Sequence, residues 1–154
     1  MSRIIVSFFI ILFYPLISLA QQDITFTTSD KYFPVISTAI GEVSESGPFL
    51  SVVLEQYTMR IKKDYKFPVN VLKYKVGIAF QTQNGGWDIA RWSDAVDENI
   101  VMLAGQTKLI KNYKAVIPID GLPSLRGYWL VLAVESKING TNGFTYAHSN
   151  KDIF

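Results

Sequence analysis

The feature that most constrains this chain is a regular alternation of apolar and polar residues between Val69 and Phe80. Apolar side chains occupy every second position: Leu72, Tyr74, Val76, Ile78 and Phe80. Lys73 and Lys75 alternate with them. Because successive side chains of a strand point to opposite faces, this pattern predicts a half-buried β-strand.

A hairpin turn is expected directly after this strand. Residues 83–86, Gln-Asn-Gly-Gly, include the residue types that most readily adopt positive φ. Trp87–Trp92 is then the expected return strand. Trp87 and Trp92 differ in parity, so a regular strand would place their side chains on opposite faces.

The segment from Phe49 to Lys62 changes phase part of the way along. Before the change the apolar residues share one parity, and after it they share the other: Leu50, Val52 and Leu54, then Tyr57, Met59 and Ile61. One additional residue near Glu55 and Gln56, a β-bulge, would bring both sets to the same face. We therefore predict a bulged strand here.

The C-terminal part of the chain contains three further strand patterns. Tyr113–Ile119 alternates and includes Pro118, which predicts a strand near an edge or an end. Tyr128–Glu135 is apolar on both parities and is expected to be the most central strand. Phe144–His148 follows a glycine-rich turn and is the expected last strand.

Residues 94–104 are the one segment with a credible helical pattern. Ser93 could cap such a helix and Gly105 could end it, while the acidic residues between them suit a helix N-terminus. The alternative is a loop followed by a short buried strand at Ile100–Ala104. The sequence supports the helix and the loop followed by a strand equally.

These patterns together predict an all-β fold. Roughly seven to nine short strands indicate an antiparallel β-sandwich of immunoglobulin-like or fibronectin-like architecture, with one optional short helix near residues 94–104. A small closed β-barrel is the alternative.

The first twenty residues have the layout of a secretory signal peptide. Arg3 precedes the apolar run Ile4–Phe13, and small residues lead to a cleavage site after Ala20. A retained membrane anchor is the alternative, but the segment is short for a membrane span and contains Pro15. We expect a signal peptide at 1–20, a single β-domain at 21–154 with no integral membrane segment, and a secreted, periplasmic or cell-surface protein.

The composition removes much of the usual catalytic chemistry. The chain contains no Cys and a single His, His148, which excludes disulfides, thiolate sites and metal sites built from several histidines. The formal net charge is only +2, without the basic excess of nucleic-acid-binding proteins. We expect no cofactor, no nucleic-acid partner and a function in binding, with no oligomeric state indicated.

The hairpin carries the candidate binding residues. Trp87, Asp88, Arg91 and Trp92 combine two large aromatic rings with charged groups beside a flexible turn. Such a set is typical of protein-binding hot spots and of sugar-binding surfaces. The hypothesis is that loops at one end of the domain bind a protein or a glycan surface.

Two other functions remain as alternatives. A structural or assembly subunit could exchange or add strands through Tyr128–Glu135 or the last strand. The carboxylates of Asp94, Asp97 and Glu98 could contribute to an irregular calcium site, or to a small carboxylate-dependent hydrolase. A solvated acidic segment is the simpler interpretation of these three residues.

Overall fold

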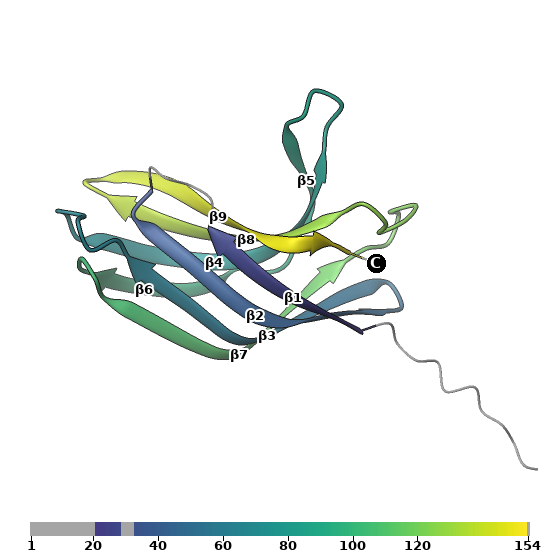
Figure 1. The fold of residues 1–154 in the computed structure, drawn as a ribbon, viewed down its shortest axis with the longest axis horizontal. Coiled ribbons are helices and arrows are strands. Elements are labelled where there is room, and N and C mark those ends of the chain that lie inside the picture. The colour runs from purple at the N-terminus through teal and green to yellow at the C-terminus, as the bar shows by residue number, and fades with distance from the viewer. Residues whose placement is uncertain (1–20, 29–32, 154) are drawn as a thin grey trace, which may run out of the picture.

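The computed structural model describes residues 21–28 and 33–153, and every regular element in them is a β-strand (Figure 1). The strands are β1 Gln21–Thr28, β2 Val35–Ser46, β3 Phe49–Ile61, β4 Val69–Gln81, β5 Trp87–Trp92, β6 Val96–Met102, β7 Thr107–Pro118, β8 Trp129–Ile138 and β9 Thr141–Asp152. The predicted signal peptide, residues 1–20, lies outside the described residues. In the described part of the chain no helix could cross a membrane.

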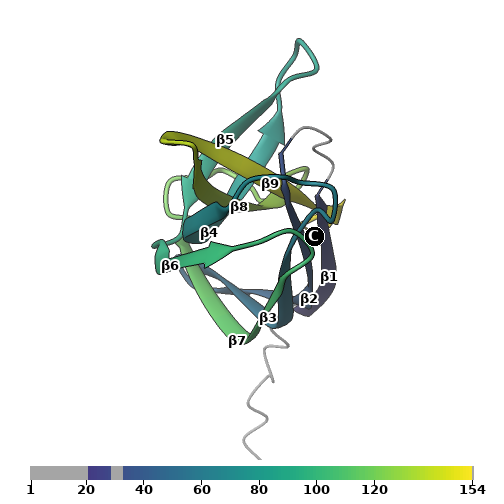
Figure 2. The ribbon, with the colours of Figure 1, turned by 90° about the vertical axis from the view of Figure 1, so that its left-hand side faces the viewer.

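The strands form one antiparallel sheet that curls into a half-barrel (Figure 2). Their order is β5-β4-β8-β9-β1-β2-β3-β7, and β6 pairs with β4 beside β5. β5 pairs with the C-terminal half of β4 and β6 with its N-terminal half. The predicted all-β class is confirmed.

The bulge predicted in the third strand is confirmed. Ile40 of β2 pairs with Gln56 of β3, whereas the next residue, Gly41, pairs with Leu54. Glu55 is therefore the additional residue. The phase change works as predicted, since Leu54 before the bulge and Tyr57 after it are both fully buried.

A second bulge interrupts β4, so the prediction that Leu72 shares a face with Tyr74 is wrong. The register with β8 shifts between Val71, which pairs with Ser136, and Lys73, which pairs with Glu135. Leu72 is therefore the additional residue in this pairing, and it is only half-buried. The core face of β4 is supplied by Val71 before the bulge and by Tyr74, Val76 and Ile78 after it.

The helix expected at residues 94–104 is wrong, and the alternative of a loop followed by a strand is correct. The strand begins and ends earlier than the expected Ile100–Ala104, because Val96–Met102 forms β6. The expectation that it is buried is wrong, since Val101 and Leu103 are exposed. Half-buried and exposed side chains alternate along β6 until the buried Met102. Pairing with β4 satisfies the backbone of this segment and overrides the local helical signals.

The edge position predicted for the strand that contains Pro118 is confirmed. The strand expected to be the most central, β8, is internal but stands third in the strand order, so that prediction is wrong in detail. β8 pairs with β4 on one side and with β9 on the other, and Leu130–Val134 are buried. β7 is an edge strand that ends at Pro118, which lacks a backbone N–H for further pairing.

Three tyrosines connect the two sides of the curled sheet across the core. Tyr74 of β4 packs edge to face against Tyr57 of β3, with ring centroids 5.3 Å apart, and against Tyr113 of β7, at 5.0 Å. The Tyr57 hydroxyl lies 3.3 Å from the Ser37 hydroxyl. Burial raises the pKa of Tyr74 to about 12, so its hydroxyl stays neutral in the core.

Candidate functional site

The β4–β5 hairpin projects beyond the other strands (Figures 1 and 2). Its turn is closed by hydrogen bonds from the Thr82 amide to the Gly86 carbonyl, at 2.8 Å, and from the Gly85 amide to the Thr82 carbonyl, at 2.9 Å. Gly85 has φ +78°, a conformation that glycine adopts without strain. The predicted glycine turn and return strand are thus both present.

Trp87 and Trp92 lie on the same face of the sheet, unlike the expectation for a regular strand. Trp92 pairs with Gly77, whereas Trp87 pairs with Gln81, and the register shifts between them. Ala90 is the additional residue of this bulge. It reverses the parity of β5, so that both indoles point outward.

Asp88 and Arg91 are directed to the opposite side of β5. The Asp88 carboxylate is exposed and accepts a hydrogen bond from the Ile89 amide, at 2.8 Å. Arg91 donates to the Ala90 carbonyl at 2.8 Å and to the Asp120 carbonyl at 3.5 Å. The structure therefore separates the two predicted charged residues from the two tryptophan rings.

Aromatic rings gather on the outer surface of β5, β4, β8 and β9. We call this surface the aromatic face; its rings are Trp87, Trp92, Trp129, Phe144, Tyr146 and His148. Trp87 packs edge to face against Trp129, with centroids 5.8 Å apart, and lies 5.6 Å from the His148 ring. Phe144 and Tyr146 occupy successive outward positions of β9, and their planes differ by only 14°.

A shallow hollow of about 240 Å³ lies among these rings. Its lining is Ala79, Trp87, Ile89, Val131, Tyr146 and His148. Ala79 pairs with Trp129, and Val131 pairs with Gly77. Both Ala79 and Val131 face outward, yet they are fully buried because the surrounding rings cover them. Trp87, Phe144 and Tyr146 remain 46%, 41% and 38% exposed, so ring surface is available to a ligand.

Polar groups lie beside the rings. The Glu135 carboxylate forms an ion pair with Lys73, 3.2 Å from Nζ to Oε2, and accepts a hydrogen bond from the Asn142 amide, also 3.2 Å. Glu135 pairs directly with Phe144 across β8 and β9. The carboxylate therefore holds an ammonium and an amide in fixed positions next to an exposed ring.

His148 connects the hollow to β1. It pairs with Val131 on one side and with Thr27 on the other. Burial lowers the pKa of His148, so the imidazole is neutral at pH 7. Its Nδ1 atom is buried and has no hydrogen-bond partner among the described residues.

Sequence reasoning identified two rings of this face, Trp87 and Trp92, and overlooked the others. The alternation of Phe144, Tyr146 and His148 along the last strand was the available signal. That signal gains meaning only from the strand order β5-β4-β8-β9, which brings the last strand to the same surface as the hairpin.

The acidic segment before and within β6 does not converge on one point. Glu98 forms an ion pair with Lys108 of β7, at 3.1 Å. Asp97 and Glu98 are adjacent in β6 and so point to opposite faces. Within residues 21–28 and 33–153, no three His, Cys, Asp or Glu side chains form a group that could hold a metal ion.

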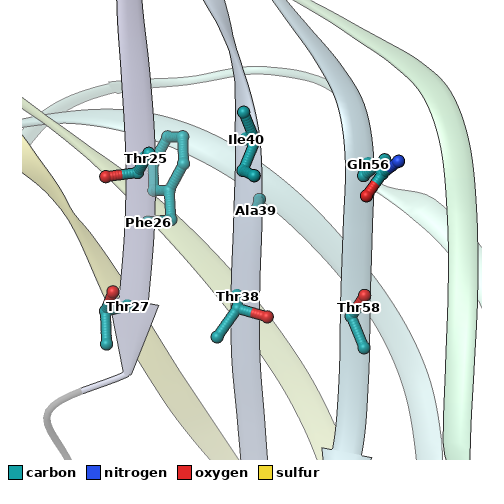
Figure 3. Close-up of a pocket in the computed structure, with 8 residues that line it drawn as sticks. All are labelled: Thr25, Phe26, Thr27, Thr38, Ala39, Ile40, Gln56 and Thr58. Carbon is teal, nitrogen blue, oxygen red and sulfur yellow. The ribbon is translucent and has the colours of Figure 1, made fainter.

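A second hollow, also of about 240 Å³, lies over β1, β2 and β3 (Figure 3). We call it the threonine hollow; its outward side chains are Thr25, Thr27, Thr38, Ile40, Gln56 and Thr58. Threonine suits exposed strand positions for its β-branched shape alone. The lining of the threonine hollow contains neither a charged side chain nor an exposed ring, so the aromatic face is the stronger candidate.

The strands named in the assembly hypothesis are internal to the sheet. β8 pairs with β4 and β9, and β9 pairs with β8 and β1. Strand addition would therefore take place at another strand, such as the edge strand β7.

Comparison of the chain with protein-family models, with curated proteins and with solved structures finds no significant match.

Proposed function

We propose that this protein is an exported, non-catalytic binding domain and that its aromatic face binds a glycan. The observation that carries the proposal is the row of half-exposed rings on a rigid β-surface, Trp87, Tyr146 and Phe144. Ring faces are electron-rich, so the C–H groups of a sugar ring pack well against them.

The polar groups favour a glycan over a protein as the ligand. Lys73, Glu135 and Asn142 form a hydrogen-bonded set at the edge of the Phe144 ring, which suits the hydroxyls of a sugar. The hollow, at about 240 Å³, is smaller than the roughly 300–1,000 Å³ of usual small-molecule sites. A hollow of this size suits one ring of an extended chain.

Affinity electrophoresis through gels that contain soluble polysaccharides tests the proposal. We expect at least one polysaccharide of a broad panel to retard the wild-type domain, and Tyr146→Ala to remove the retardation. Phe49→Ala is the control, since Phe49 is a similarly exposed ring on β3. Equal retardation of Tyr146→Ala and wild type would contradict the proposal, as would the absence of retardation by every member of the panel.

Export is the second part of the proposal and has its own test. It is supported by the charged start, the apolar run and the small residues before Gln21. Expression of the full chain in a secreting host should release a product whose first residue is Gln21. A product that stays with the cells and begins at Met1 would contradict export.

A further inference from the structure

We propose that the glycan bound by the aromatic face is acidic, and that Lys75 pairs with its anionic group. This inference rests on the proposed function and names the class of ligand. The chemistry shared by the possible ligands is a saccharide that carries a carboxylate or a sulfate.

The first support is the position of Lys75 at the centre of the aromatic face. Lys75 pairs with Ala133 of β8, and Ala133 pairs with Tyr146 of β9, so the three residues form one row across the sheet. Two strand spacings separate Lys75 from Tyr146, about 10 Å between Cα atoms. The side chain of Ala133, which lies between them, is small and does not block the space between Lys75 and Tyr146. A glycan that packs against Tyr146 and extends across Ala133 toward β5 would thus approach the Lys75 amine, which lies over the Trp92 ring.

The second support is that the charge of Lys75 is not compensated. Lys73, two residues earlier, is neutralised by Glu135 at 3.2 Å. Lys75 forms no ion pair within the described residues; its Nζ instead lies 4.3 Å from the centre of the Trp92 ring. The ring holds the ammonium in place without neutralising it. An anion on the ligand would complete this interaction.

The third support is the close packing that fixes Trp92. Gly77 lies beneath the indole, and a Cβ at this position would come within 2.5 Å of Trp92 Cε3. The absence of a side chain at Gly77 leaves room for the ring against the sheet, where the Lys75 amine lies over it. The ammonium is therefore presented by a rigid surface, which reduces the entropy lost when a ligand binds.

Titration calorimetry with defined oligosaccharides tests the inference. The probes are an oligogalacturonide, a sulfated oligosaccharide and a neutral cello-oligosaccharide of the same number of sugars. The proteins are wild type, Lys75→Met, Lys75→Arg and Lys114→Met. Met retains the apolar stem against Trp92, Arg retains the charge, and Lys114 is an exposed lysine of β7.

We expect wild type to bind an acidic probe about tenfold or more tightly than the neutral one, as charge-assisted hydrogen bonds allow. Lys75→Met should lose this preference, whereas Lys75→Arg and Lys114→Met should keep it. The acidic probe that binds better identifies carboxylate or sulfate as the anion.

Two results would overturn the inference and leave glycan binding intact. One is equal affinity of wild type for acidic and neutral probes, and the other is an unchanged preference in Lys75→Met. Failure of every probe to bind would overturn the inference, and Tyr146→Ala in the polysaccharide panel then decides separately on the proposed function.

Discussion

The indole of Trp87 packs edge to face against the indole of Trp129, with 5.8 Å between the ring centroids. This contact joins the tip of the β4–β5 hairpin to the internal strand β8, 42 positions further along the chain. It leaves one side of the Trp87 ring exposed. The same residue therefore anchors the hairpin and contributes surface to the aromatic face.

Removal of the Trp87 ring should affect binding more than folding. Trp87→Ala loses an edge-to-face contact on a half-exposed surface, a cost of about 1 kcal/mol in unfolding free energy. Glycan affinity should fall about tenfold or more, in line with the loss of a binding hot spot. Urea denaturation and calorimetric titration measure the two effects. Phe49→Ala, with the same exposed fraction of 46%, should leave affinity unchanged.

A side chain at Gly77 should disturb the Trp92 ring. The Cβ of Gly77→Ala would come within 2.5 Å of Trp92 Cε3 and 2.9 Å of the Arg91 carbonyl oxygen. We expect the indole to lift from the sheet and to lose its contact with Lys75. Exposure to acrylamide should then quench more of the tryptophan fluorescence than in wild type. Unchanged quenching would show that the ring does not depend on the glycine.

Gly41 of β2 should tolerate alanine poorly because it pairs with Leu54, next to the bulge of β3. A Cβ at this position would overlap the backbone carbonyl of Val53, and backbone atoms cannot move without disturbing the ladder. We expect Gly41→Ala to lose about 2–4 kcal/mol of unfolding free energy. Gly86→Ala is the matched control, since its Cβ would meet only the Thr82 hydroxyl, at 3.2 Å. Equal stability of the two variants would contradict this account of the bulge.

The stability of the domain should fall as pH decreases through the range in which histidine titrates. Burial lowers the pKa of His148 in the folded state, so the unfolded chain binds the proton more readily. The stabilising contribution is complete above the unfolded-state pKa, about 6.5. This contribution is lost as pH falls through the lower pKa that His148 has in the folded state.

His148 is the only histidine of the chain, which makes this effect measurable. Thermal unfolding of wild type between pH 7.5 and about 5.5 should show the decline. His148→Gln should show a flatter profile, because the amide does not titrate. If stability falls equally with pH in wild type and in His148→Gln, the loss of stability comes from titratable groups other than His148.

The local features of the fold could be predicted because they depend on neighbouring residues. The phase change around Glu55 identified the bulge, and the Gln-Asn-Gly-Gly turn identified the hairpin. The apolar segment Tyr128–Glu135 identified β8 as an internal strand. Residues 94–104 were ambiguous because capping residues and alternation coexist there. Pairing with β4, which is a long-range interaction, stabilises the strand over the helix.

The candidate site could be predicted only in part, because it depends on strand order. Trp87 and Trp92 stood out by residue type, but their common face results from the bulge at Ala90, which alternation does not reveal. Tyr146 and His148 join them through the pairing of β9 with β8. Asp88 and Arg91 are close in sequence to the tryptophans and yet point away from them.

Chemical-shift mapping by NMR tests the central claim most directly, because it locates the ligand without any substitution. Addition of an acidic oligosaccharide to the ¹⁵N-labelled domain should shift the indole N–H of Trp87 and the amides of Phe144 and Tyr146. Signals from the threonine hollow, such as the Thr58 amide, should stay in place. Shifts confined to the threonine hollow or to the edge strand β7 would contradict the assignment of the aromatic face as the binding surface.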